Sequence, residues 1–165
     1  KLKMMNDFNS HDVTREIEGD IDSPNISGTL GGRPNLFGFI GFNKGFKPIK
    51  IVREILQKLV TMNEKPTIID IQTKTKYSFR ILTPTEEELE SATPLPFEPG
   101  SWLTGIEKGI NGLTRYIYWR LNHPASRSGL GLQAKNILRV LEFKPVDYVG
   151  KLLENFSKRF SSRQR

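Results

Sequence analysis

The sequence contains no cysteine among its 165 residues, and its only histidines are His11 and His123. The absence of cysteine excludes a disulfide framework, a thiolate zinc site and a cysteine nucleophile, and it fits a reducing compartment. Neither histidine has another histidine or a carboxylate at the usual spacing of metal ligands, so we expect no metal site. A run of the ~20 apolar residues that a membrane span needs is also missing. We therefore expect a soluble, intracellular protein without a membrane-spanning segment.

Groups that could carry out catalysis are few. Ser126 and Ser128 lie near His123, but a serine-rich loop lacks the shielded nucleophile and orienting acid of a catalytic triad. The acidic residues Glu86–Glu88 and Glu90 are adjacent, whereas paired catalytic carboxylates sit in different environments. We interpret them as a solvated acidic knob that can dock a basic patch. The sequence therefore predicts a protein that is not an enzyme, with no catalytic residues and no cofactor.

The net charge of +7 is unevenly distributed along the chain. Residues 1–34 carry four basic and six acidic side chains, a net charge of −2. Residues 35–100 carry nine and eight, a net of +1, and residues 101–165 carry twelve and four, a net of +8. This asymmetry indicates that the C-terminal part contacts either a phosphate backbone or an acidic protein face.

The organisation that we predict is an extended N-terminal arm over 1–34, a single domain over 35–160 and a basic tail over 161–165. The arm is polar, shows no helical or strand period and ends in glycine and proline. We expect it to become ordered only against a neighbouring molecule.

Residues 35–46 combine aromatic side chains with glycine. Phe37, Phe39 and Phe42 are separated by Gly38 and Gly41, which disfavour both helix and strand. These aromatic side chains do not belong in free solvent. They either fold back over the protein's own core or insert into an adjoining subunit as anchors, and we take them as candidate partner contacts.

The remaining pattern predicts an α+β fold. A helix begins at Pro48, strands over 69–72 and 77–81 form a hairpin with a turn at 73–76, and Thr85 caps a helix over 86–90. After a proline-rich linker, Ser101 caps a long central helix over 102–121, followed by a strand over 132–143 and a last helix opened by Pro145. We therefore expect a small, largely antiparallel sheet packed on the long central helix, with the extended arm and a C-terminal helix.

Three glycines on one face of the predicted central helix are candidate contacts. Gly105, Gly109 and Gly112 each cost about 1 kcal/mol relative to alanine inside a helix. A smooth groove that lets another backbone approach would explain them. That neighbour is either the protein's own sheet or a second subunit.

Basic side chains interleaved with aromatic ones suggest a second kind of contact. Tyr116, Tyr118 and Trp119 are flanked by basic residues, an arrangement that can grip a single nucleic-acid strand. The candidate contacts to phosphate or to an acidic partner are Arg115, Arg120, Arg127, Lys135 and Arg139. No helix-turn-helix, zinc-finger or RNA-recognition pattern is present.

The region from Ser101 to Phe160 has a distinctive order of segments. A long amphipathic helix leads into a polar loop with Ser126-Arg127-Ser128-Gly129, then a strand, then a terminal helix led by proline, Pro145-x-x-Tyr148-Val149-x-x-Leu152-Leu153-x-x-Phe156. This region resembles the tail-completion and neck proteins of long-tailed bacteriophages, which arrange a helix, an Arg-Ser/Thr-Gly loop and a closing helix on a small α+β domain. The segment between Gly129 and Pro145 is shorter than in that family, and the aromatic segment at 35–46 has no counterpart there.

The resemblance implies a structural virion protein, made in the host cytoplasm, with no catalytic residues. It implies a homo-oligomeric ring that joins the head, at the portal, to the tail and contacts neighbouring virion proteins. The acidic start and basic end of the chain suit head-to-tail contacts around such a ring. The alternative class is a basic accessory protein that binds nucleic acid, and non-specific DNA contact is compatible with both.

Overall fold

The structure is a computed structural model of the chain. It describes residues 1–31, 35–62, 67–71, 74–96, 99–110, 116–118, 124, 131–134 and 143–161.

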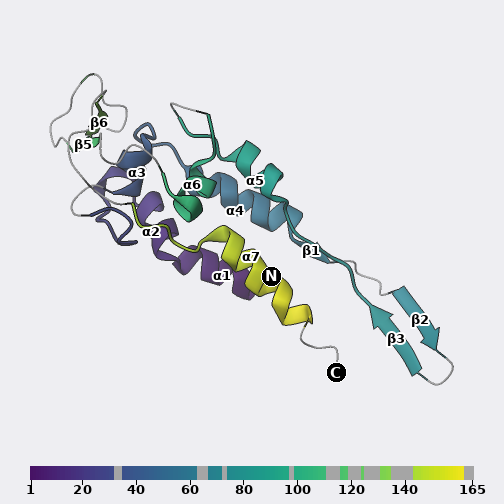
Figure 1. The fold of residues 1–165 in the computed structure, drawn as a ribbon. Helices are drawn as coiled ribbons and strands as arrows, with labels where there is room; N and C mark the ends of the chain where they lie inside the picture. Colours follow the sequence, from purple (N-terminus) through teal and green to yellow (C-terminus); the bar gives the residue numbers. More distant parts are fainter. Residues whose placement is uncertain are drawn as a thin grey trace.

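Helices make up the body of the molecule, and a β-hairpin projects from one end of it (Figure 1). The helical segments are α1 (Leu2–Ser10), α2 (Asp12–Glu18), the 3-10 turn η1 (Asp20–Asp22), α3 (Leu36–Ile40), α4 (Pro48–Leu59), α5 (Glu86–Ala92), α6 (Trp102–Lys108) and α7 (Val149–Ser161). Helix α4 lies between α5 on one side and α1 on the other, and α7 packs along α1.

The strands pair as antiparallel ribbons of two, so the chain is mixed helix and sheet, as predicted. The strands are β1 (Thr61–Met62), β2 (Thr67–Ile71), β3 (Lys74–Ser78), β4 (Ile81–Leu82), β5 (Tyr116–Tyr118) and β6 (Gly131–Gln133). β2 pairs with β3 from Thr67 opposite Ser78 to Ile71 opposite Lys74, which confirms a hairpin here. Its second strand begins earlier than predicted, since residues 74–76, predicted as the turn, belong to β3, and the predicted strand over 77–81 overlaps β3 only at residues 77 and 78. β1 pairs with β4 at its base, and β5 pairs with β6.

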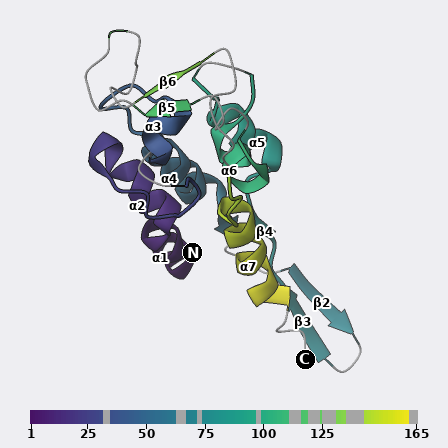
Figure 2. The ribbon, with the colours of Figure 1, turned by 60° about the vertical axis from the view of Figure 1, so that its left-hand side comes forward.

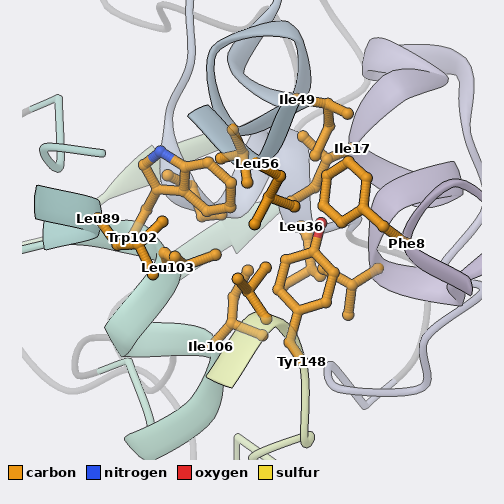
Figure 3. Close-up of a cluster of buried hydrophobic side chains, with 14 of the residues drawn as sticks. Phe8, Ile17, Leu36, Ile49, Leu56, Leu89, Trp102, Leu103, Ile106 and Tyr148 are labelled. Carbon is orange, nitrogen blue, oxygen red and sulfur yellow. The ribbon is translucent and has the colours of Figure 1, made fainter. Parts of the chain in front are cut away.

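The hydrophobic core collects side chains from both ends of the sequence. Figure 3 shows Phe8 and Ile17 from the first two helices beside Leu56 of α4, with Trp102 and Tyr148 closing the cluster. Each of these five side chains is at most 2% exposed. The packing of α1, α2 and α7 onto α4 and α6 is therefore continuous, and it fixes the frame from which the hairpin projects.

Two helices form where local signals predict them. Pro48 occupies the first turn of α4, and the apolar stripe Ile49, Val52 and Leu56 is buried. Thr85 and Glu88 form a capping box at the start of α5, because the Thr85 hydroxyl accepts from the Glu88 N–H while the Glu88 carboxylate accepts from the Thr85 N–H.

The prediction of an extended N-terminal arm is wrong. Residues in this region form α1 and α2, with a break at His11, where the backbone is extended. Phe8 is fully buried, and Val13 and Ile17 lie four residues apart on the buried face of α2. The two helices were missed because each is too short to show several repeats of a helical period. Their burial makes this region part of the core.

The long central helix is also wrong. α6 ends at Lys108, because Gly109 has φ +109° and ψ 137°, a conformation that interrupts a helix and favours glycine. The Ser101 cap is confirmed, since its hydroxyl accepts from the Thr104 N–H at 3.2 Å. Residues 116–118, predicted to be helical, form the strand β5.

The C-terminal helix begins later than Pro145, at Val149. The preceding segment is held by other elements, since the Lys144 N–H donates to the Thr29 carbonyl and the Val146 N–H donates to the Ile106 carbonyl. Of the predicted strand over 132–143, β6 covers its first two residues, Phe143 lies outside a strand and residues 135–142 lie outside the described residues.

Tyr148 should give the folded protein a measurable sensitivity to alkaline pH. Its hydroxyl and that of Thr14 form a buried hydrogen bond of 2.7 Å. Burial raises the pKa of Tyr148, so its phenol stays neutral in the folded protein while the unfolded chain ionises from about pH 10. Its contribution to stability is therefore complete below about pH 10 and is lost as the pH rises.

We expect the unfolding free energy of Tyr148→Phe to fall less steeply than that of the parent above about pH 10, by about 1.4 kcal/mol per pH unit. Urea denaturation of both proteins between pH 8 and pH 11.5 measures this difference. Parallel curves for the two proteins above pH 10 would contradict the prediction.

Candidate protein interface at the hairpin end

The strands β1 to β4 form a ribbon that we call the hairpin arm. Figure 1 and Figure 2 both show β2 and β3 extending beyond the helices, joined to the body through β1 and β4. A two-stranded hairpin is at best marginally stable by itself in water, and it usually needs a third strand or a helix against it. The arm therefore has the form of an element that is covered by another molecule.

Large apolar side chains are exposed along the arm. Met62, Ile68, Phe79 and Leu82 are 54%, 61%, 51% and 51% exposed. The register sets Met62 opposite Ile81 and Thr61 opposite Leu82, so Met62 and Leu82 lie on opposite faces of the ribbon. Contiguous exposed apolar patches mark interaction surfaces, whereas single exposed side chains are ordinary. The sequence pattern predicted the strands but not this exposure, because alternation cannot show whether a partner covers the face.

The ends of three helices meet where the arm leaves the body. The Lys1 ammonium donates to the carbonyl of Gln57 in the last turn of α4, and Arg159 near the end of α7 lies 3.4 Å from the carboxylate of Asp7. Beside these contacts Leu2 and Phe160 are also exposed, at 77% and 43%. We call this region, with the hairpin arm, the hairpin end. Among the residues whose side-chain exposure the structure describes, seven large apolar side chains are exposed, and Phe46 is the one of these that lies elsewhere.

Charged side chains flank the hairpin end. On α5, Glu86 pairs with Lys108 of α6 at 2.6 Å, and this ammonium lowers the pKa of the Glu86 carboxyl while that carboxylate raises the pKa of Lys108. On α7, Lys158 and Lys151 both contact Glu154 and hold the pKa of its carboxyl at about 2. Both groups are solvated, so salt will screen them.

The three phenylalanines predicted as partner contacts lie inside the protein. Phe37 and Phe39 belong to α3, Phe42 follows it, and all three are at most 2% exposed. α3 forms despite its glycine because the Asn35 side chain caps its start and Gly41, at φ +81°, ends it. The interpretation of these side chains as anchors in an adjoining subunit is therefore wrong, and the alternative of burial in the protein's own core is confirmed.

The candidate glycine groove is not the face of one helix. A β carbon at Gly105 would lie 2.7 Å from Cγ1 of Ile110, so the space there is filled by the chain's own side chain. Gly109 lies beyond the last residue of α6, where its positive φ explains the glycine. Gly112 lies outside the described residues.

The candidate basic contacts also lie outside the described residues, as do His123, Ser126 and Ser128. They are Arg115, Arg120, Arg127, Lys135 and Arg139. His11 is described, and it has a structural role: its Nδ1 accepts from the Val13 N–H and its Nε2 donates to the Asp147 carbonyl.

No protein-family model, curated protein or solved structure matches this chain. Within the part of the chain that the structure describes, no helix has the length and apolar content needed to cross a membrane. The same described ranges hold no group of three or more His, Cys, Asp or Glu side chains arranged to bind a metal ion.

Proposed function

We propose that this protein is a non-enzymatic structural protein that associates with copies of itself through the hairpin end. The observation that carries the proposal is the concentration of exposed apolar side chains at that end, on an arm that projects from the helical body. The resemblance of the sequence of residues 101–160 to phage neck and tail-completion proteins suggests a more specific role; of the segments that carry it, the structure keeps the closing helix but not the long helix before the loop. In that role the protein forms a ring in the neck or at the tail terminus of a virion and joins head to tail.

The apolar surface is large enough to contribute to such an assembly without completing it. Burying a Leu, Ile, Met or Phe side chain fully contributes about 1.5–3 kcal/mol, so covering the exposed halves of Met62, Ile68, Phe79 and Leu82 contributes about 3–6 kcal/mol. Association costs about 4–15 kcal/mol in lost freedom of motion. Further contacts must therefore act beside the arm.

Replacing exposed apolar side chains of the hairpin arm should reduce self-association without unfolding the protein. We expect the double variant Ile68→Thr and Phe79→Thr to shift the molar mass in sedimentation velocity from an oligomer toward the monomer. Thermal unfolding should be nearly unchanged, because both side chains are more than half exposed. Phe46→Thr is the matched control, since Phe46 is 45% exposed but lies away from the hairpin end.

A parent protein that stays monomeric at every accessible concentration would overturn self-association. Tight DNA binding by that monomer, falling steeply as salt rises, would instead favour the nucleic-acid-binding alternative. The placement in the neck has its own test. Antibodies against the chain should label the junction of head and tail in purified virions, and labelling at any other position would contradict it.

A further inference from the structure

The hairpin end carries opposite charges on its two sides. On one side α5 begins directly after β4, and its first turn holds Glu86, Glu87 and Glu88, all exposed. On the other side α1 begins and α7 ends, with Lys3, Lys158 and Arg159 exposed. Figure 1 shows the two sides separated by α4 and the base of the arm. We call them the acidic flank (α5 with Lys108) and the basic flank (Lys1, α1 and α7).

The flanks keep a net charge after their internal pairs are counted. The acidic flank has four carboxylates, of Glu86, Glu87, Glu88 and Glu90, and one cation, Lys108, which gives −3. The basic flank has five cations and two carboxylates, which gives +3; they are Lys1, Lys3, Lys151, Lys158 and Arg159 with Asp7 and Glu154.

One exposed side chain on each flank is available for a neighbour. Glu86 pairs with Lys108 and Glu88 belongs to the capping box, whereas the Glu87 carboxylate makes no ion pair with a described residue. Glu87 lines an open cleft of about 690 Å³ between α5 and α6, together with Glu90. Lys3, on the basic flank, likewise makes no ion pair with a described residue. Lys108 and Thr104 line the same cleft, and the Thr104 hydroxyl donates to the Glu90 carboxylate, so a lysine that enters there would pair with Glu87.

We propose that the occupant of the hairpin end is a second copy of this chain, whose basic flank faces the acidic flank of the first. This inference rests on the proposed function, and it names the partner and the contact. A nucleic acid or an anionic membrane would be attracted by one flank and repelled by the other, so both fit poorly. A chain that carries both signs can satisfy either flank of a neighbouring copy. Each copy then presents its acidic flank to one neighbour and its basic flank to another, and this head-to-tail contact forms a ring where the rotation closes and an open filament where it does not.

Charge reversal tests the contact directly. We expect Lys3→Glu and Glu87→Lys, each alone, to weaken self-association by about tenfold or more, because each places like charges across the contact. An equimolar mixture of the two single variants should associate more tightly than either variant alone. In the mixture, the reversed charge at position 3 of one variant can face the reversed charge at position 87 of the other, and this contact is again attractive. The chain that carries both substitutions should regain most of the parent's affinity. Sedimentation equilibrium of all four samples measures these changes.

Asp22→Lys and Lys144→Glu are the matched controls. Both residues are exposed, and they lie in segments away from the hairpin end. Neither control should change association, and thermal melting should show that all variants fold. Raising the salt to about 1 M, where the screening length falls to about 3 Å, should weaken the parent's association.

The outcomes separate this inference from the proposed function. Single reversals that associate like the parent, or that weaken association without recovery in the mixture and in the double variant, would overturn the pairing of flanks. The proposed function would survive that result if Ile68→Thr with Phe79→Thr still abolished association. A parent that never self-associates would overturn both.

Discussion

Replacing Phe8 with alanine should lower the free energy of unfolding by about 3–5 kcal/mol. Phe8 is fully buried in α1, and its ring stacks against that of Tyr148 with 5.9 Å between centroids. Truncation leaves a cavity between α1 and α7, which the surrounding helices can fill only in part. Urea denaturation of the parent and the variant measures the loss.

Leu2→Ala is the control for this prediction. Leu2 lies in the same helix but is 77% exposed, so its truncation should change stability by less than about 0.5 kcal/mol. If Phe8→Ala were as mild as Leu2→Ala, α1 would not be part of the core, and the N-terminal region would behave as the loosely attached arm that its polar composition suggests.

Replacing Glu16 with alanine should cost about 3–5 kcal/mol, because its carboxylate connects three segments. Glu16 lies in α2 and is fully buried. Its Oε2 accepts from the Ser27 N–H and its Oε1 from the Leu36 N–H, both at 2.7 Å. Alanine would leave the buried Leu36 N–H and the partly buried Ser27 N–H without this acceptor, and the first residue of α3 would lose its anchor.

Two further variants separate this effect from a general loss of charge. Glu16→Gln keeps one acceptor oxygen but places an amide nitrogen against the second N–H. Its free energy of unfolding should therefore lie between those of the parent and of the alanine variant. Glu54→Ala removes a carboxylate whose pair with Lys50, at 3.8 Å, is exposed, and it should be nearly neutral. A Glu16→Ala protein as stable as Glu54→Ala would show that the two N–H groups find other acceptors. Chemical denaturation compares all three.

The elements predicted correctly from the sequence are those whose signals are local. Pro48 and the apolar stripe behind it define α4, while Thr85 and Glu88 define the start of α5 within four residues. Alternation of apolar and polar residues predicted the hairpin of β2 and β3, although it set the second strand over 77–81 instead of Lys74–Ser78. In each case the neighbours in sequence supply the stabilising contacts, so no knowledge of the tertiary structure is needed.

The errors fall where distant contacts decide the structure. α1 and α2 are short and polar, and they hold because Phe8 and Thr14 contact Tyr148. The apolar pattern after Ser101 continued as a helix in the prediction, but the backbone turns at Gly109 and places Ile110 against Gly105. The spacing of the glycines predicted that another group lies close to Gly105, but it did not show that this group is the Ile110 side chain.

The candidate interface was only partly visible in the sequence. The acidic residues of α5 were predicted as a docking surface, and the structure places Glu87 at the surface beside the hairpin end. The exposure of Met62, Ile68 and Leu82 depends on the direction in which the arm leaves the body, which no local pattern encodes. Phe160 continues the apolar stripe of α7. It remains partly exposed because α1, which covers the earlier part of α7, does not extend over the end of this helix.

The hydrogen bond between Thr14 and Tyr148 spans 134 residues of sequence, and it has a consequence for synthesis of the chain. At about 5–20 residues per second, roughly 7–27 seconds separate the emergence of these two positions from the ribosome. During that interval Phe8 lacks the cover that Tyr148 provides, and Phe39 of α3 lacks that of Phe143. The nascent chain is therefore exposed to aggregation for longer than a chain with mostly local contacts, and the packing of α1 should be completed only after Tyr148 has emerged.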